Sequence, residues 1–147
     1  MTMSKQEYKK MTEKASPGTT YGKNMLMAFL VGGGICAAGQ ALANLYMQMG
    51  LELKDARTFV SISLIALSAL LTAFQAYDNI AKHAGAGTLV PITGFANSIV
   101  APAMEFKSEG YIIGIGGKMF VIAGPVLVYS ITASILYGFI IWIFHLY

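Results

Sequence analysis

From Asp78 to Lys118 the chain reads DNIAKHAGAGTLVPITGFANSIVAPAMEFKSEGYIIGIGGK, between strongly apolar segments but without the composition of an ordinary membrane span. Residues 83–104 contain no Asp, Glu, Lys or Arg, but they contain glycines and prolines, which break helices, and polar Asn97 and Ser98. Within hydrocarbon a broken backbone persists only inside protein or beside water, because its freed polar groups need partners. This stretch therefore predicts a broken or re-entrant element beside a polar pathway.

The composition of the whole chain is that of an integral membrane protein. Of 147 residues, 56% are hydrophobic and 12% are charged, and the mean hydropathy is +0.61. A soluble domain carries about twice that charged fraction. The length allows one domain. The net charge of +3 is better explained by N-terminal lysines beside an anionic membrane surface than by nucleic acid, so membrane lipid is an expected partner and nucleic acid is not.

The fold class predicted from these runs is an all-α integral membrane protein with about four membrane-inserted helical segments, the third broken or re-entrant. Residues 1–24 are expected to form a basic cytoplasmic tail with one surface helix over residues 4–14. A single membrane domain follows over residues 25–147, with segments at about 25–50, 58–78, 88–106 and 118–145. The first uncharged run exceeds the roughly 20 residues that a span needs.

The topology of residues 84–118 stays open at this point. The lysine-rich tail places the N-terminus in the cytoplasm by the positive-inside rule. If residues 88–104 cross the membrane once, residues 105–118 lie outside; if they dip and return, residues 105–118 lie inside. The charges in that loop balance and do not decide between the two.

Polar residues gather on one face of each of the first two segments. Gln40 and Asn44 lie one helical turn apart, and Ser68, Thr72 and Gln75 share a face of the second segment. Such a face turns away from lipid, toward protein or water, and for the amides of the first segment helix locking is slightly favoured over pore lining. The candidate pathway-lining or gating residues are Gln40, Asn44, Ser68, Thr72, Gln75, Asn97, Ser98 and Ser130.

Other residues are candidates for hinges or for charged edges of the membrane segments. The hinge candidates are Pro91, Gly94, Gly117 and Pro125, and a kink is expected at Pro125 because proline cannot donate to the carbonyl of Val121. The charged edge candidates are Asp78, Lys82, Glu105 and Glu109. Asp78 and Lys82 are spaced to pair on a helix, although interfacial anchoring is the expected role of most of these residues. Asn97 follows a point where a half-helix could begin, and half-helix N-termini suit carboxylates.

No motif in the chain predicts catalysis. The run Gly114–Lys118 lacks the phosphate-loop spacing, because Ile112 occupies the first glycine position and Met119 the Ser/Thr position. Cys36 is the single cysteine, and no His/Cys metal spacing or Ser-His-Asp arrangement occurs. We therefore expect no enzyme, no metal site and no cofactor.

Several short blocks of the sequence form a recognisable pattern: AFLVGGGIC at 28–36, YD at 77–78, AGAG at 84–87, VPITGFANS at 90–98 and KSEG at 107–110. With these blocks the chain resembles the stage V sporulation protein AC/AE family. The resemblance covers roughly residues 20–145, nearly the whole chain, and its most specific part is AGAG with VPITGFANS.

The resemblance implies a small protein of the inner membrane of the forespore and spore. It would act as one subunit, in a homo- or hetero-oligomer, beside other stage V sporulation membrane and peripheral proteins. The family is linked to moving dipicolinic acid, as its calcium chelate, into the developing spore and out at germination, and one member is regarded as a tension-gated channel. No catalytic residues are implied.

A channel or translocation subunit for dipicolinate with calcium is therefore the expected function. A path lined by amides and hydroxyls suits this charge-compensated solute better than a bare anion, for which pores usually carry rings of Arg or Lys. Two alternatives are kept. One is a non-conducting structural membrane subunit of a multi-protein complex; the other is an ion-coupled small-solute transporter, for which Asp78 is the only candidate carboxylate close to the core.

Overall fold

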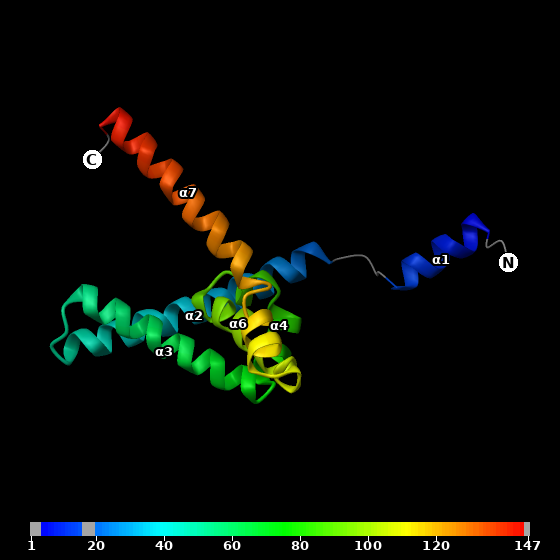
Figure 1. Cartoon of the computed structure of the whole chain (residues 1–147), viewed down its shortest axis with the longest axis horizontal. Helices are drawn as coiled ribbons and strands as arrows, with labels where there is room; N and C mark the ends of the chain where they lie inside the picture. The colour runs from blue at the N-terminus through cyan, green and yellow to red at the C-terminus, as the bar shows by residue number, and fades with distance from the viewer. Residues whose placement is uncertain (1–3, 16–19, 146–147) are drawn as a thin grey trace.

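The computed structural model is all-helical over the residues that it describes, 4–15 and 20–145 (Figure 1). Residues 1–3, 16–19 and 146–147, which belong to the predicted tail and to the end of the predicted membrane domain, lie outside the described residues. Three helices are long and apolar enough to cross a membrane, namely α2 (Tyr21–Gln48), α3 (Leu53–Ala73) and α7 (Ala123–Phe144). The predicted all-α membrane class is confirmed, whereas crossing or return of the third predicted segment stays a prediction.

The polar helix α1 (Lys5–Ala15) begins with a capping box. The backbone N–H of Ser4 donates to Glu7 Oε2 at 3.0 Å, and the N–H of Glu7 donates to Ser4 Oγ at 3.3 Å. This reciprocal pair satisfies two N–H groups at the start of the helix. The backbone of Ser4 first, and its hydroxyl second, hold the pKa of Glu7 below its ordinary value. A helix is therefore present where the sequence predicts one over residues 4–14, and its place at a surface stays a prediction.

Helices α2 and α3 form an antiparallel hairpin (Figure 1). The hydroxyl groups of Tyr46 and Ser63 lie 2.7 Å apart and join the two helices. The ring of Tyr46 also packs against that of Phe59, with 5.8 Å between centroids. These contacts fix the register of the two helices near the turn that connects them.

Helix α3 ends at Ala73, earlier than the sequence predicts. Gln75 has a left-handed backbone with φ of 58°, its N–H donates to the carbonyl of Thr72 at 2.9 Å, and α4 (Ala76–Ala84) starts directly after it. This corrects the single segment predicted over residues 58–78, and it leaves Gln75 exposed at a turn instead of on the face of Ser68 and Thr72. No glycine or proline marks this turn in the sequence.

The third predicted segment is broken. Helix α5 (Ala86–Leu89) is separated from α6 (Ile92–Glu105) by the extended backbone of Pro91, which starts α6. At about 1.5 Å per residue the 14 residues of α6 span about 21 Å, less than the roughly 30 Å of a hydrocarbon core. Pro102 lies inside α6, so the carbonyl of Ser98 lacks its usual helical donor.

Two short helical turns, η1 (Lys107–Glu109) and η2 (Tyr111–Gly116), connect α6 to α7. The hinge candidate Gly117 follows η2 directly, and Nζ of Lys118 lies 4.9 Å above the ring of Phe106. Helix α7 then extends away from the other helices (Figure 1), and its one buried residue among those described is Ala123. The kink expected at Pro125 is corrected: Pro125 lies in the first turn of α7, where a missing N–H costs no helical hydrogen bond.

Candidate functional site

The backbone of the broken segment lies directly on its neighbours at two glycines. A Cβ at Gly87 would overlap the carbonyl oxygen of Ala28 on α2 and would lie 2.9 Å from its Cα. A Cβ at Gly94 would overlap the carbonyl oxygen of Thr88 and would lie 2.7 Å from that of Leu89. Only glycine permits such approaches, so α5 packs against α2 and the first turn of α6 folds back over α5.

Hydroxyl and amide side chains join α3 to α6. The hydroxyl of Ser68, which is fully buried, donates to the carbonyl oxygen of Thr93 at 2.6 Å. One turn further along α3, Oγ1 of Thr72 lies 2.7 Å from the carbonyl oxygen of Ser68 and 2.8 Å from Oδ1 of Asn97. Since a hydroxyl has one proton, both contacts are satisfied at once when the Asn97 amide is turned over and Nδ2 donates to Thr72.

Tyr77 extends this contact to α4 and α5. Its hydroxyl donates to the carbonyl oxygen of Thr88 at 2.9 Å and lies 3.1 Å from Oγ1 of Thr93. Tyr77, Thr88 and Thr93 are all buried. We call the six residues Ser68, Thr72, Tyr77, Thr88, Thr93 and Asn97 the polar seam.

The polar seam is closed in this structure. Among the described residues, no buried side-chain nitrogen or oxygen atom lacks a hydrogen-bond partner. An unpaired polar group would be costly at this depth, so the pairing stabilises the contact between α3 and the broken segment. It also means that the hydroxyls of Ser68 and Thr72 face protein and not an open water path.

Two cavities meet at the polar seam. One, of about 310 Å³, has walls of Gly34, Ala38 and Leu67 and is also lined by the seam residues Ser68, Tyr77, Thr88 and Thr93. The other, of about 350 Å³, is lined by Asn97, Ser98 and Glu105 together with Tyr77 and Thr88. Because Tyr77 and Thr88 line both cavities, the seam lies where the two adjoin.

The structure brings some of the sequence-predicted residues together and leaves others apart. Ser68, Thr72 and Asn97 meet in the seam, and Ser98 lies beside Asn97 with its hydroxyl donating to the carbonyl of Phe95 at 2.7 Å. Gln40 and Asn44 pair with each other at 2.9 Å on the exposed surface of α2. Gln75 and Ser130 are exposed, the first at a turn and the second on α7.

Sequence reasoning missed three members of the seam, Tyr77, Thr88 and Thr93. Thr93 lies four residues before Asn97, so the helical period alone places both on one face of α6. Tyr77 had no such signal, because the turn at Gln75 that aims it inward has no mark in the sequence.

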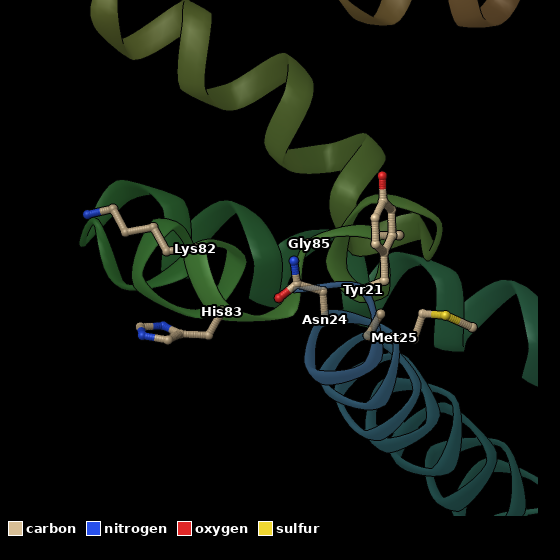
Figure 2. A pocket seen from close by; sticks show the side chains of 8 residues that line it. Tyr21, Asn24, Met25, Lys82, His83 and Gly85 are labelled. Carbon is tan, nitrogen blue, oxygen red and sulfur yellow. The ribbon is translucent and has the colours of Figure 1, made fainter. Parts of the chain in front are cut away.

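An open pocket lies where the start of α2 meets the end of α4 (Figure 2). It has about 330 Å³ and is lined by Tyr21, Asn24, Lys82 and His83, among others. In Figure 2, Lys82 and His83 project from α4 away from Tyr21 and Asn24, so these two side chains flank the pocket and do not close over it. Nδ1 of His83 lies 2.9 Å from the carbonyl oxygen of Asn79.

The charged edge candidates form no charge cluster in the described part of the chain. Asp78 and Lys82 are both exposed on α4, and no ion pair joins them there. Glu105 lines the larger cavity beside the seam, whereas Glu109 is exposed in η1. No group of three or more His, Cys, Asp or Glu residues that could hold a metal ion occurs among the residues described.

The chain is similar to known proteins over most of its length. The family described as SpoVAC/SpoVAEB sporulation membrane protein matches residues 24–140. Stage V sporulation protein AC of Bacillus subtilis (strain 168) is 45% identical over 141 residues, which cover 95% of this chain and 94% of that protein. No solved structure matches the chain.

Proposed function

The chain belongs to the SpoVAC/SpoVAEB family of sporulation membrane proteins, and from that membership and the polar seam we propose that it is a channel subunit for dipicolinic acid. The solute passes as its calcium chelate into the developing spore and out again at germination. The chain sits in the inner membrane of the forespore with its N-terminus in the cytoplasm, acts with other stage V sporulation proteins, and has no catalytic role. Membrane tension opens it.

The observation that carries this proposal is the position of the seam between two cavities. The hydrogen bonds of Ser68 and Thr72 hold α6 against α3, and those of Tyr77 hold α5 and α6 against α4. Because Tyr77 and Thr88 line both cavities, moving α6 away from α3 joins the two spaces into one path lined in part by hydroxyl and amide groups. We propose this movement as the opening step.

The chemistry of the seam suits opening toward water. When water fills the gap between α3 and α6, a water molecule replaces the protein partner in each hydrogen bond. The net cost is then about 0.5–1.5 kcal/mol per bond. In lipid the same separation would leave each group unsatisfied, at several kcal/mol each. The seam therefore opens only where water and a hydrated solute enter the gap between α3 and α6.

The six residues of the seam carry no formal charge. A bare anion crossing a membrane needs compensating cations along its path, commonly rings of Arg or Lys. Dipicolinate bound to calcium has its carboxylate charge compensated already, so hydroxyl and amide groups are sufficient for it. The proposal therefore predicts that the chelate passes more readily than a bare anion.

Release from vesicles tests this function. The full chain is reconstituted into vesicles loaded with calcium dipicolinate, and release is followed by terbium luminescence after an osmotic downshift. We expect release above that of protein-free vesicles, and slower efflux of chloride measured in parallel. No release at any downshift short of lysis would overturn the proposal for the isolated chain, and chloride passing as readily as the chelate would overturn its substrate.

A non-conducting structural subunit is the second candidate function. It is favoured by α7, which is exposed along nearly its whole length and so has surface to bury against partner helices. Single cysteines at Gln40, Ser68, Asn97 and Ser130, in a Cys36→Ala background, distinguish the two. A path subunit under tension admits water-soluble thiol reagents to Ser68→Cys and Asn97→Cys, whereas a structural subunit leaves both unlabelled. An ion-coupled transporter has less support, since Asp78 is exposed on α4.

A further inference from the structure

A separate pocket lies on the flank of the α2–α3 hairpin, away from the polar seam. It has about 310 Å³, with apolar walls from Gly39, Ala43 and Val60 and polar groups from Gln40, Arg57 and Ser61. Gly39 on α2 faces α3: a Cβ there would make ordinary contacts at 3.5 Å from Leu64 and 3.8 Å from Val60. The hairpin itself therefore forms the floor of the pocket.

Arg57 is the single arginine of the chain, and its guanidinium has no hydrogen-bond or ion-pair partner among the described residues. An arginine offers five N–H donors in a planar fork that matches a carboxylate or a phosphate with two parallel hydrogen bonds. No acidic side chain lines this pocket. The fork is thus available to an anionic group from outside the chain.

Gln40 supplies a second donor. One N–H of its amide is given to Oδ1 of Asn44 at 2.9 Å, which leaves the other N–H for a ligand. The hydroxyl of Ser61 donates to the backbone carbonyl of Arg57 at 3.1 Å, and this hydrogen bond holds the helical turn that carries Arg57. The hydroxyl oxygen of Ser61 remains available as an acceptor. An amide and a guanidinium therefore face the same space from two helices.

The position of the pocket agrees with an anion at a membrane surface. Arg57 follows the start of α3 at Leu53 by one helical turn, about 6 Å at 1.5 Å per residue. Glu52, Lys54, Asp55 and Arg57 make the hairpin end neutral, so no general positive field gathers anions there. Binding must come from the specific donors.

We infer that the pocket of Gln40, Arg57 and Ser61 binds the anionic head of a ligand, a phosphate or a carboxylate. Arg57 holds two of its oxygen atoms, the free N–H of Gln40 donates to it, and Ala43 and Val60 contact the apolar part. A phospholipid and a soluble carboxylate share this chemistry. The site is independent of the seam and of the channel function proposed above.

Binding to the purified full chain in a neutral detergent tests the inference. The probes are short-chain phosphatidylglycerol, short-chain phosphatidylcholine and phthalate, each titrated and followed by native mass spectrometry. The variants are Arg57→Gln, Arg57→Lys and Gln40→Leu, with Lys54→Gln as a matched control that removes a neighbouring positive charge outside the pocket lining. Circular dichroism of each variant checks that the helices are intact. Because Arg57 is exposed, we expect its replacement to leave the fold unaffected.

We expect phosphatidylglycerol or phthalate to bind, and Arg57→Gln to weaken that probe about tenfold or more, as for loss of charge-assisted hydrogen bonds. Arg57→Lys weakens it less, Gln40→Leu weakens it measurably, and Lys54→Gln leaves it unchanged. If Arg57→Gln weakens the binding of phosphatidylglycerol, the ligand is a lipid. If it weakens the binding of phthalate, the ligand is a soluble carboxylate. Equal binding by Arg57→Gln and wild type, an equal effect of Lys54→Gln, or no binding of either anionic probe would overturn the inference.

Discussion

The hydroxyl of Ser68 donates a 2.6 Å hydrogen bond to the carbonyl oxygen of Thr93, across the interface between α3 and α6. Both residues are buried. The bond reaches the first turn of α6, directly after the break at Pro91. It therefore ties the first turn of α6 to a helix long enough to cross the membrane.

Replacing Ser68 by alanine should destabilise the closed arrangement. The carbonyl of Thr93 loses a buried donor, which costs about 1–3 kcal/mol. Unfolding of the purified chain in mixed micelles measures this cost, and Ser130→Ala is the control, because the hydroxyl of Ser130 is exposed and bonds only within its own helix. Equal stability of the two variants would contradict the role given to Ser68.

Alanine at Gly87 or at Gly94 should prevent the broken segment from packing. The added Cβ would overlap a backbone carbonyl oxygen in each case, which a side-chain rotation cannot relieve, so we expect a loss of about 3 kcal/mol or more. The control is Gly33→Ala on α2, where a Cβ meets nothing within 4 Å. That variant should be neutral or slightly more stable, by about 0.5–1 kcal/mol. Similar stabilities for Gly33→Ala and Gly87→Ala would show that α5 does not lie on α2.

Removing the hydroxyl of Tyr77 should loosen α5 while the ring stays in place. Tyr77→Phe leaves the carbonyl of Thr88 without its side-chain donor, at a cost of about 1–3 kcal/mol. Hydrogen exchange should then become faster over residues 86–93. Tyr129→Phe is the matched control, since Tyr129 is 77% exposed on α7. Unchanged exchange in Tyr77→Phe would mean that this hydrogen bond does not hold the segment.

The start of α1 should depend on pH through Glu7. Its pKa is lowered in the folded helix by Ser4, so its contribution to helix stability is complete above the ordinary value of 4.5 and is lost as the pH falls through the lowered pKa. Ser4→Ala removes the hydroxyl, the smaller of the two causes, and keeps the backbone N–H, so it should raise the pKa of Glu7 part of the way toward 4.5, which an NMR titration of the carboxyl carbon in the full chain measures. Thr12→Ala removes another hydroxyl from the same helix and should leave that pKa unchanged.

Much of this architecture follows from residue pattern alone. Long uncharged runs predict α2, α3 and α7, and the glycines and prolines of residues 83–104 predict a broken segment, because each reflects a local property of the chain. The half-helix expected to begin just before Asn97 begins instead at Ile92, after Pro91. The turn at Gln75 does not follow, since a non-glycine residue adopts a left-handed backbone there only in its tertiary context. Without that turn Tyr77 cannot be aimed at Thr88 and Thr93, so the hydrogen bonds of Tyr77 were out of reach of sequence patterns, although Thr93 shares the helical face of Asn97.

The same dependence on tertiary context applies to residues whose position follows from the sequence but whose role does not. Ser68 and Thr72 share a polar face, which predicts that they turn away from lipid, and both are buried. Whether such a face meets water or protein depends on what lies opposite, and here Thr93 and Asn97 lie opposite. For Pro125 the deciding fact is where α7 begins, which the uncharged run over residues 119–147 does not mark.

Locking the seam is the most direct test of its opening. Thr72→Cys with Asn97→Cys, in a Cys36→Ala background, places two thiols where side-chain atoms lie 2.8 Å apart between α3 and α6. The control pair, Gly39→Cys with Val60→Cys, staples α2 to α3 away from the seam, where a Cβ at Gly39 would lie 3.8 Å from Cγ1 of Val60. Both are recorded by patch clamp under suction in reconstituted membranes, before and after oxidation.

We expect oxidation of the seam pair to abolish tension-activated conductance and a reductant to restore it, with the control pair conducting in both states. Unchanged conductance through the oxidised seam pair would contradict opening between α3 and α6.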